Sequence, residues 1–98
     1  MSVLVELTVF PTDKGVSVSP YVARVVDIIR SSGLSCQLGP MGTCIEGEWD
    51  EIMAAITKCY HELATDCDRI YIVMKADCRR GAKDRLHGKV ESVESKLN

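Results

Sequence analysis

The chain has 98 residues and a formal net charge of −2 at pH 7, which suits one domain and gives no sign of a nucleic-acid surface. No apolar run approaches the roughly 20 residues that span a membrane. The first residues lack the basic start and small-residue cleavage site of a secretion signal. We therefore expect a cytoplasmic protein with a single domain over residues 1–98.

The cysteine content is high for this length, and it indicates the redox compartment. The odd number of cysteines and the absence of a Cys-x-x-Cys pair argue against a disulfide framework. Zinc would need clustered ligands, and the spacing of Cys59, His61 and Cys67 is awkward for a metal site. We therefore expect no metal and no cofactor, and buried free thiols in a reducing compartment. The five cysteines are Cys36, Cys44, Cys59, Cys67 and Cys78.

The first part of the chain predicts a strand followed by a helix. Residues 2–10 alternate and are rich in valine, which is typical of a strand. Ser19 suits a helix N-cap and Pro20 suits the first helical position. Apolar residues then recur at helical spacing, and Gly33 follows as a helix-ending glycine. This pattern predicts a helix over about 20–32.

The rest of the chain predicts a hairpin, a second helix, a strand and a last helix. Residues 34–38 and 43–48 are predicted strands joined by a turn at 39–42. Asp50 is the expected cap of a helix that ends near Ala64. A strand over 69–77 follows, and an amphipathic helix begins near Lys83. Gly88 weakens this last helix, so it needs a docking surface.

This order of elements predicts an α+β fold, a ferredoxin-like βαββαβ sandwich with an additional C-terminal helix. Its first and third strands are expected at the centre, with both main helices on one face. The other face would be bare in a monomer. Alternation places both apolar and charged residues there, so we expect another subunit to cover it. The residues expected on this face include Leu4, Glu6, Thr8, Phe10, Cys44, Glu46, Tyr71, Val73, Lys75 and Asp77.

Two acids on the open face need an explanation. Glu6 and Glu46 are expected on adjacent central strands, and a carboxylate is costly to bury without a partner. If they lie close together, at least one pKa should rise unless a cation sits between them. Three interpretations remain open. Lys75 or an arginine pairs with the acids in an interface, an organic cation or amine-bearing heterocycle binds them, or they are simply exposed.

The segment Gly39-Pro40-Met41-Gly42-Thr43-Cys44-Ile45-Glu46-Gly47 is the most specific motif of the chain. With this segment, the chain resembles the small thiamine-binding protein family, the single-domain relatives of the YkoF-like binders of thiamine and hydroxymethylpyrimidine. Three weaker segments also match, in the same order and at the same spacing as in the family, so the match spans nearly the whole chain. These are Pro11-Thr12…Val18-Ser19-Pro20-Tyr21-Val22, Asp77-Cys78-Arg79-Arg80-Gly81 and Lys89-Val90-Glu91-Ser92-Val93-Glu94.

The resemblance implies a homotetramer built from sheet-to-sheet dimers that binds thiamine or hydroxymethylpyrimidine without turnover, with a part in vitamin salvage. A carboxylate such as Glu46 could accept from the aminopyrimidine, and the Thr43 hydroxyl could bond the same edge. Gly42 would allow close backbone approach. Cys44 stands where a small, often hydroxylated residue is expected. The ligand-binding residues expected are Glu46, Thr43, Gly42, Glu6, Ser17, Ser19 and Cys44, with Ser17 and Ser19 near the hydroxyl end of the ligand.

Other interpretations of the same residues stay open. The hairpin glycines could serve the turn alone, and Ser19 could be only a cap. Arg79 and Arg80 could form inter-subunit ion pairs or a solvated loop rather than a phosphate site. The second function hypothesis is an oligomeric regulatory or assembly module that binds another metabolite or none. An enzyme is less favoured, because no nucleophile is placed beside a histidine and no basic phosphate loop follows the first strand.

Overall fold

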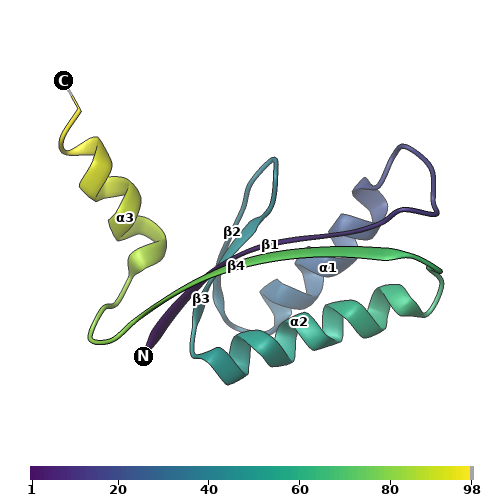
Figure 1. Cartoon of the computed structure of the whole chain (residues 1–98), viewed down its shortest axis with the longest axis horizontal. Coiled ribbons are helices and arrows are strands. Elements are labelled where there is room, and N and C mark those ends of the chain that lie inside the picture. The colour runs from purple at the N-terminus through teal and green to yellow at the C-terminus, as the bar shows by residue number, and fades with distance from the viewer. Residues whose placement is uncertain (98) are drawn as a thin grey trace.

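The computed structural model describes residues 1–97, and it confirms the predicted α+β ferredoxin-like fold (Figure 1). Four strands form one antiparallel sheet in the order β2-β3-β1-β4, so the first and third strands are central as predicted. Helices α1 and α2 cover the same face of this sheet. The elements are β1 Ser2–Pro11, α1 Ser19–Ser31, β2 Ser35–Leu38, β3 Thr43–Gly47, α2 Trp49–Ala64, β4 Ile70–Arg79 and α3 Arg85–Glu94.

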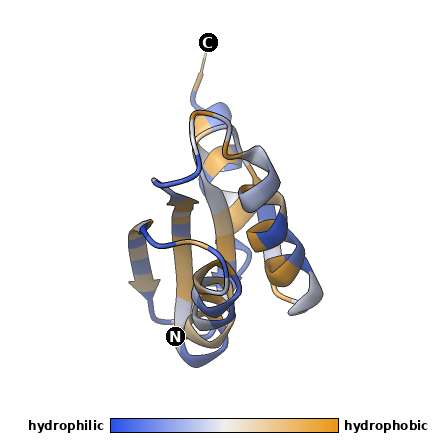
Figure 2. Cartoon of the chain, turned by 90° about the vertical axis from the view of Figure 1, so that its right-hand side faces the viewer, coloured by the Kyte–Doolittle hydropathy of each residue, from blue (hydrophilic) through white to orange (hydrophobic). Residues whose placement is uncertain are grey.

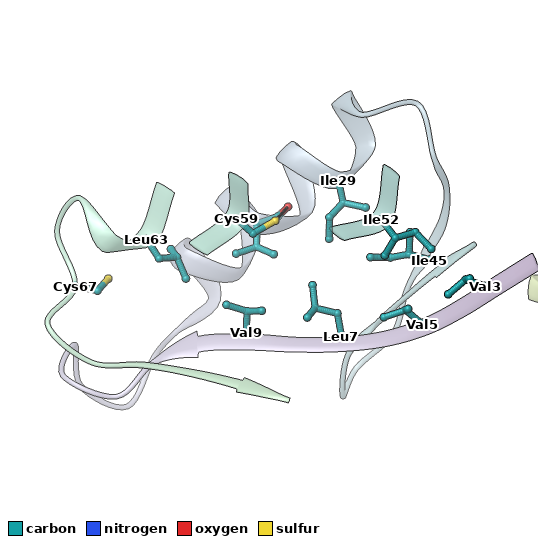
Figure 3. Packing of buried hydrophobic residues seen from close by; sticks show 11 residues of the cluster. Val3, Val5, Leu7, Val9, Ile29, Ile45, Ile52, Cys59, Leu63 and Cys67 are labelled. Atoms are coloured by element: carbon teal, nitrogen blue, oxygen red, sulfur yellow. Dashed lines mark hydrogen bonds between the residues drawn. The ribbon is translucent and has the colours of Figure 1, made fainter. Parts of the chain in front are cut away.

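The hydrophobic core lies between β1 and the two helices, and it follows directly from the strand alternation. Alternate residues of β1 are buried, and they face Ile29 of α1 and Ile52, Cys59 and Leu63 of α2 (Figure 3). Hydrophobic and hydrophilic bands alternate along the helices and strands (Figure 2). Full burial of one such aliphatic side chain contributes about 1.5–3 kcal/mol, so this single layer supplies much of the stability. The β1 residues are Val3, Val5, Leu7 and Val9.

The helix starts differ slightly from the predicted ones. Val18 occupies the N-cap of α1, and no side chain caps it, so Ser19 is the first helical residue rather than the cap. Glu48 occupies the N-cap of α2, which places Asp50 inside the first turn. A carboxylate there still stabilises the helix, because it lies near the positive end of the helix dipole. The predicted caps are therefore wrong by one and two residues, while the helices themselves are confirmed.

Strand β4 is longer than predicted and lies at the edge of the sheet. It runs two residues past Asp77, because Arg79 pairs with Ser2 at the start of β1. Its first half is exposed on both faces, with Tyr71 at 52% on one face and Ile72 at 43% on the other. A long apolar edge strand is prone to pair with or pack against another chain. The structure thus places the largest apolar exposure of β4 in its first half.

The first turn of helix α3 covers part of the sheet face that was expected to be bare. This turn docks beside β3, where Arg85 and Leu86 are buried, while Val90 and Val93 further along α3 are exposed. Figure 1 shows α3 apart from α1 and α2, beyond one end of the sheet. The expectation of a bare face is therefore wrong at this end, because the start of α3 covers Glu46. The outer part of the α3 stripe stays without a partner in the single chain.

Two further expectations concern the cysteines and the membrane. All five cysteines carry free thiols, but only Cys59 and Cys67 are buried, whereas Cys78 is exposed. Within residues 1–97, no helix has both the length and the apolar character that crossing a membrane requires.

Candidate functional site at the hairpin bend

A cleft of about 210 Å³ lies where the β2–β3 hairpin meets the end of β1 and the start of α1. Ligand sites are typically apolar clefts with a few placed polar groups, and this cleft has that character. Its only hydroxyl-bearing side chains are those of Thr8 and Thr43, within the described residues. The cleft is lined by residues 7–10 of β1, by Val18, Val22, Val25 and Val26, and by residues 38–43 of the hairpin.

The hairpin bend is closed by two hydrogen bonds. The Gly39 amide donates to the Gly42 carbonyl at 2.8 Å, and the Thr8 hydroxyl donates to the Met41 carbonyl at 2.9 Å. The second bond ties the bend to β1, so Thr8 fixes one wall of the cleft. The four residues between Leu38 and Thr43 are thus positioned by both the turn and the neighbouring strand.

Gly42 is required by close approach rather than by backbone conformation. Its φ is not in the positive region, which only Gly15, Gly33 and Gly81 occupy among the described glycines. A Cβ at this position would lie 3.0 Å from the Thr8 hydroxyl oxygen and 3.1 Å from the Leu7 carbonyl oxygen. The absence of a side chain therefore lets the bend lie directly against β1.

Thr43 and Cys44 lie on opposite faces of the sheet, because successive strand residues alternate. Thr43 pairs with Leu7, and it is buried on the helix side at the cleft. Cys44 pairs with Glu6 on the open face. Burial, followed by the Glu6 charge, raises the pKa of the Cys44 thiol, although Lys75 partly offsets this. The two residues therefore do not belong to one surface, and Cys44 stays a protonated thiol at neutral pH.

Glu6 lies on the open face beside the hairpin bend. Its Cγ would be 3.3 Å from a Cβ at Gly42, so the side chain borders the bend. Its carboxylate is 3.1 Å from the Lys75 ammonium, and both side chains are largely exposed. An exposed pair of this kind contributes little to stability, so Glu6 remains available to another cation. Of the two acids, this is the one adjacent to the cleft.

Glu46 has a different position and binds the first turn of α3. Its carboxylate accepts hydrogen bonds from the amides of Arg85 at 2.8 Å and Leu86 at 3.0 Å, and from the Ser2 hydroxyl at 3.2 Å. Burial alone would raise the pKa of Glu46, but these hydrogen bonds, with the Arg85 charge, bring it below its ordinary value. The predicted rise in pKa was conditional on the absence of a nearby cation, and at Glu46 the Arg85 charge removes that condition. This acid serves as the N-terminal cap of α3.

The two serines lie apart from this cleft. Ser17 is exposed in the loop before α1, and Ser19 opens instead onto a separate shallow depression shared with Leu38 and α1. The structure thus brings Gly42 and Thr43 into one cleft, with Glu6 beside it, and places Cys44, Glu46, Ser17 and Ser19 elsewhere. Sequence reasoning missed Thr8 and Phe10 as cleft residues. Their place on β1 was predicted, but not that the hairpin bend would lie against them.

Comparisons with known proteins agree with this fold. A family model described as thiamine-binding protein matches residues 5–94. A UPF0045 protein of Methanothermobacter thermautotrophicus is 41% identical over 96 residues, covering 94% of this chain and 96% of that protein. A UPF0045 protein of Synechocystis is 38% identical over 98 residues, covering 99% of this chain and 81% of the relative. The sequence match therefore extends over almost the whole chain in each case.

Two solved structures share the whole architecture. A Methanocaldococcus jannaschii protein superposes with a TM-score of 0.88 at 29% identity, covering 95% of this chain and 96% of that one. A Thermotoga maritima protein, named as a candidate thiamine biosynthesis/salvage protein, gives a TM-score of 0.83 at 25% identity, covering 95% of this chain and 99% of that one. On its sequence and its fold, this chain belongs to the thiamine-binding protein family.

Proposed function

We propose that this protein binds thiamine, or its hydroxymethylpyrimidine moiety, in the hairpin cleft without chemical turnover. The observation that carries the proposal is the position of the cleft. It lies at the segment Gly39–Thr43, inside the region that the thiamine-binding family model matches. The name of the Thermotoga maritima neighbour supports a thiamine-related role. A non-covalent site of this kind needs no cofactor.

The cleft offers the contacts that an aminopyrimidine needs. Apolar walls from Phe10 and Met41 can pack against a flat ring, while Gly42 lets the hairpin bend lie against β1 and so shapes the cleft. The hydroxyls of Thr8 and Thr43 can donate to or accept from ring nitrogens and the exocyclic amine. In this proposal the pyrimidine occupies the cleft, and the charged thiazolium extends toward the Glu6 carboxylate.

Glu6 replaces Glu46 as the acid of the proposed site. The Glu46 carboxylate already accepts three hydrogen bonds at the start of α3, so a ligand would have to displace a helix to use it fully. Glu6 has only the exposed Lys75 as its ion-pair partner within residues 1–97. A thiazolium cation can compete with that lysine at little cost. Ser17 and Ser19 could join the site only with the hydroxyl end of a ligand that extends past the cleft.

We also propose that the protein works as a cytoplasmic homotetramer built from sheet-to-sheet dimers. Tyr71 and Val73 lie on the same face as Leu4 and Phe10, and this face carries exposed apolar surface. The exposed residues Val90 and Val93 of α3 add to it, at 55% and 61% of their surface. Packing of such surface against a second copy would stabilise both subunits. Light scattering should report a mass near four times 10.8 kDa, and a stable monomer would contradict the proposal.

Calorimetry tests the ligand directly. Thiamine and hydroxymethylpyrimidine are titrated into the wild type, into Glu6→Gln, and into Glu91→Gln as a control with an exposed acid on α3. We expect heat from at least one ligand in the wild type. Loss of the Glu6 charge should weaken the binding of thiamine about fivefold, since an exposed ion pair contributes up to about 1 kcal/mol. The neutral pyrimidine should be much less affected, and no heat from either ligand would refute the proposal.

The second candidate is an assembly or regulatory module of the same fold. The exposed apolar first half of β4 favours it, because self-association alone would explain that surface. A tetramer that gives no heat with thiamine or hydroxymethylpyrimidine would support this alternative. A tetramer that binds thiamine would support the first proposal.

A further inference from the structure

A second groove, of about 570 Å³, lies between the end of β4, the loop after it and α3. We call it the β4–α3 groove. It is distinct from the hairpin cleft, because Arg79 at its rim pairs with Ser2, whereas the hairpin bend meets β1 near Leu7. Its lining carries five basic side chains against one acid, Asp84. The basic residues are Arg79, Arg80, Lys83, Arg85 and Lys89.

Arg85 is the buried member of this set, and its guanidinium is incompletely satisfied. Only 5% of its side-chain surface is exposed. Nη1 donates to the carbonyls of Ser2 and Asp77, each at 3.0 Å, but Nε and Nη2 form no hydrogen bond in the described structure. Nη2 lies 2.5 Å from Asp77 Oδ2 as an ion pair without hydrogen-bond geometry. Both nitrogens are enclosed by the protein, so Arg85 holds the start of α3 against β1 and β4 at the base of the groove.

The local carboxylates do not balance the positive charge. Asp77 is shared, because its Oδ2 pairs with both Arg85 and Lys89. Asp84 pairs with His87. Among residues 1–97, no ion pair involves Arg79, Arg80 or Lys83. The groove therefore holds three cationic side chains, Arg79, Arg80 and Lys83, that have no ion-pair partner among the described residues.

We propose that the β4–α3 groove binds a phosphate group, either as inorganic phosphate or as part of a phosphate monoester. A phosphate dianion presents several acceptor oxygens to donors around it, and arginine fits such oxygens with paired N–H groups. The ion would accept hydrogen bonds from Arg80 and Lys83 in the loop and counter their charge. It would also connect β4 to α3, since Lys89 lies on the α3 side of the groove.

The test uses ³¹P NMR titrations with inorganic phosphate and with methyl phosphate. The variant is Arg80→Ala/Lys83→Ala, because both residues are exposed and their loss should not disturb folding. Lys58→Ala, an exposed lysine on α2, is the matched control. Each lost cation should weaken binding about fivefold, hence about 25-fold for the pair if the effects add. The control should bind as the wild type does, and thermal melts should confirm that all variants are folded.

The results separate the two sources of phosphate and the two proposals. Tighter binding of methyl phosphate assigns the groove to a phosphate ester, while equal or weaker binding assigns it to the free ion. Phosphate binding that is absent at about 10 mM, or unchanged in the double variant, overturns the proposal; 10 mM corresponds to only about 2.7 kcal/mol of binding free energy. Thiamine is also titrated into the same double variant. Unchanged thiamine binding there would show that the phosphate site and the thiamine site are independent, so that failure of one proposal does not imply failure of the other.

Discussion

Replacement of Glu46 by alanine should release α3 from the body of the protein without unfolding the core. The substitution removes the acceptor of two α3 amides, at 2.8 Å and 3.0 Å, and of the Ser2 hydroxyl. Loss of a helix cap costs about 0.5–2 kcal/mol, and the charged acceptor here favours the upper end. A cost of about 2 kcal/mol corresponds to a roughly 30-fold increase in the population of undocked α3.

Amide hydrogen exchange measures this population. Exchange of the α3 amides should accelerate about 30-fold in Glu46→Ala, while the amides of β1 and α2 keep their rates, because opening of α3 is local. Glu46→Gln keeps one neutral acceptor oxygen, so its effect should be intermediate. Glu48→Ala is the matched control, since this neighbouring acid forms only an exposed pair with the N-terminus at 3.7 Å.

Equal exchange of α3 in Glu46→Ala and wild type would refute the assigned role of Glu46 as a cap. Acceleration spread over the whole sheet would refute the local character of the effect. Either outcome would return Glu46 to the set of residues available for a ligand.

Four further predictions concern two glycines, the pH dependence of the Glu46 cap and the Cys59 thiol. Gly42→Ala should lower the free energy of unfolding by about 1–3 kcal/mol in a urea melt, because its Cβ would press on Leu7 backbone. Gly88→Ala, which meets nothing within 4 Å inside α3, should instead raise it by roughly 0.5–1 kcal/mol, and a loss would contradict the packing. The folded pKa of Glu46 is lowered, so its contribution to stability is complete above the ordinary carboxyl pKa near 4.3 and is lost as pH falls through the lower folded pKa. Hydrogen exchange of the α3 amides, measured as a function of acid pH, checks this. Burial raises the pKa of Cys59 to about 11, so this thiol should react with a thiol reagent at pH 8 only when the protein unfolds, and fast labelling of the native protein would be inconsistent with it.

Local sequence patterns predicted the elements well, because each carries its own period and its own terminating residues. Alternation fixed the two faces of β1 and β4, and helical spacing fixed the buried faces of α1 and α2. The helix caps were misplaced by one or two residues, since Ser19 and Asp50 suit the first turn almost as well as the cap. Propensity at a helix end does not distinguish neighbouring positions.

The candidate site was only partly predictable, because its decisive contacts are distant in sequence. A carboxylate on an apolar strand has the same local pattern whether it binds a ligand or caps a helix 39 residues away, as Glu46 does for Arg85. Thr8 becomes a cleft residue only through its bond to Met41, 33 residues further along the chain. Gly42 and Thr43 were predictable, because the hairpin turn that holds them is local.

The crystal structure of the protein soaked with thiamine shows directly whether the ligand binds at the hairpin bend. We expect planar density between Phe10 and Met41, with the amino edge near the hydroxyls of Thr8 and Thr43. An empty cleft at saturating thiamine, or planar density beside Glu46 at the start of α3, would contradict this expectation.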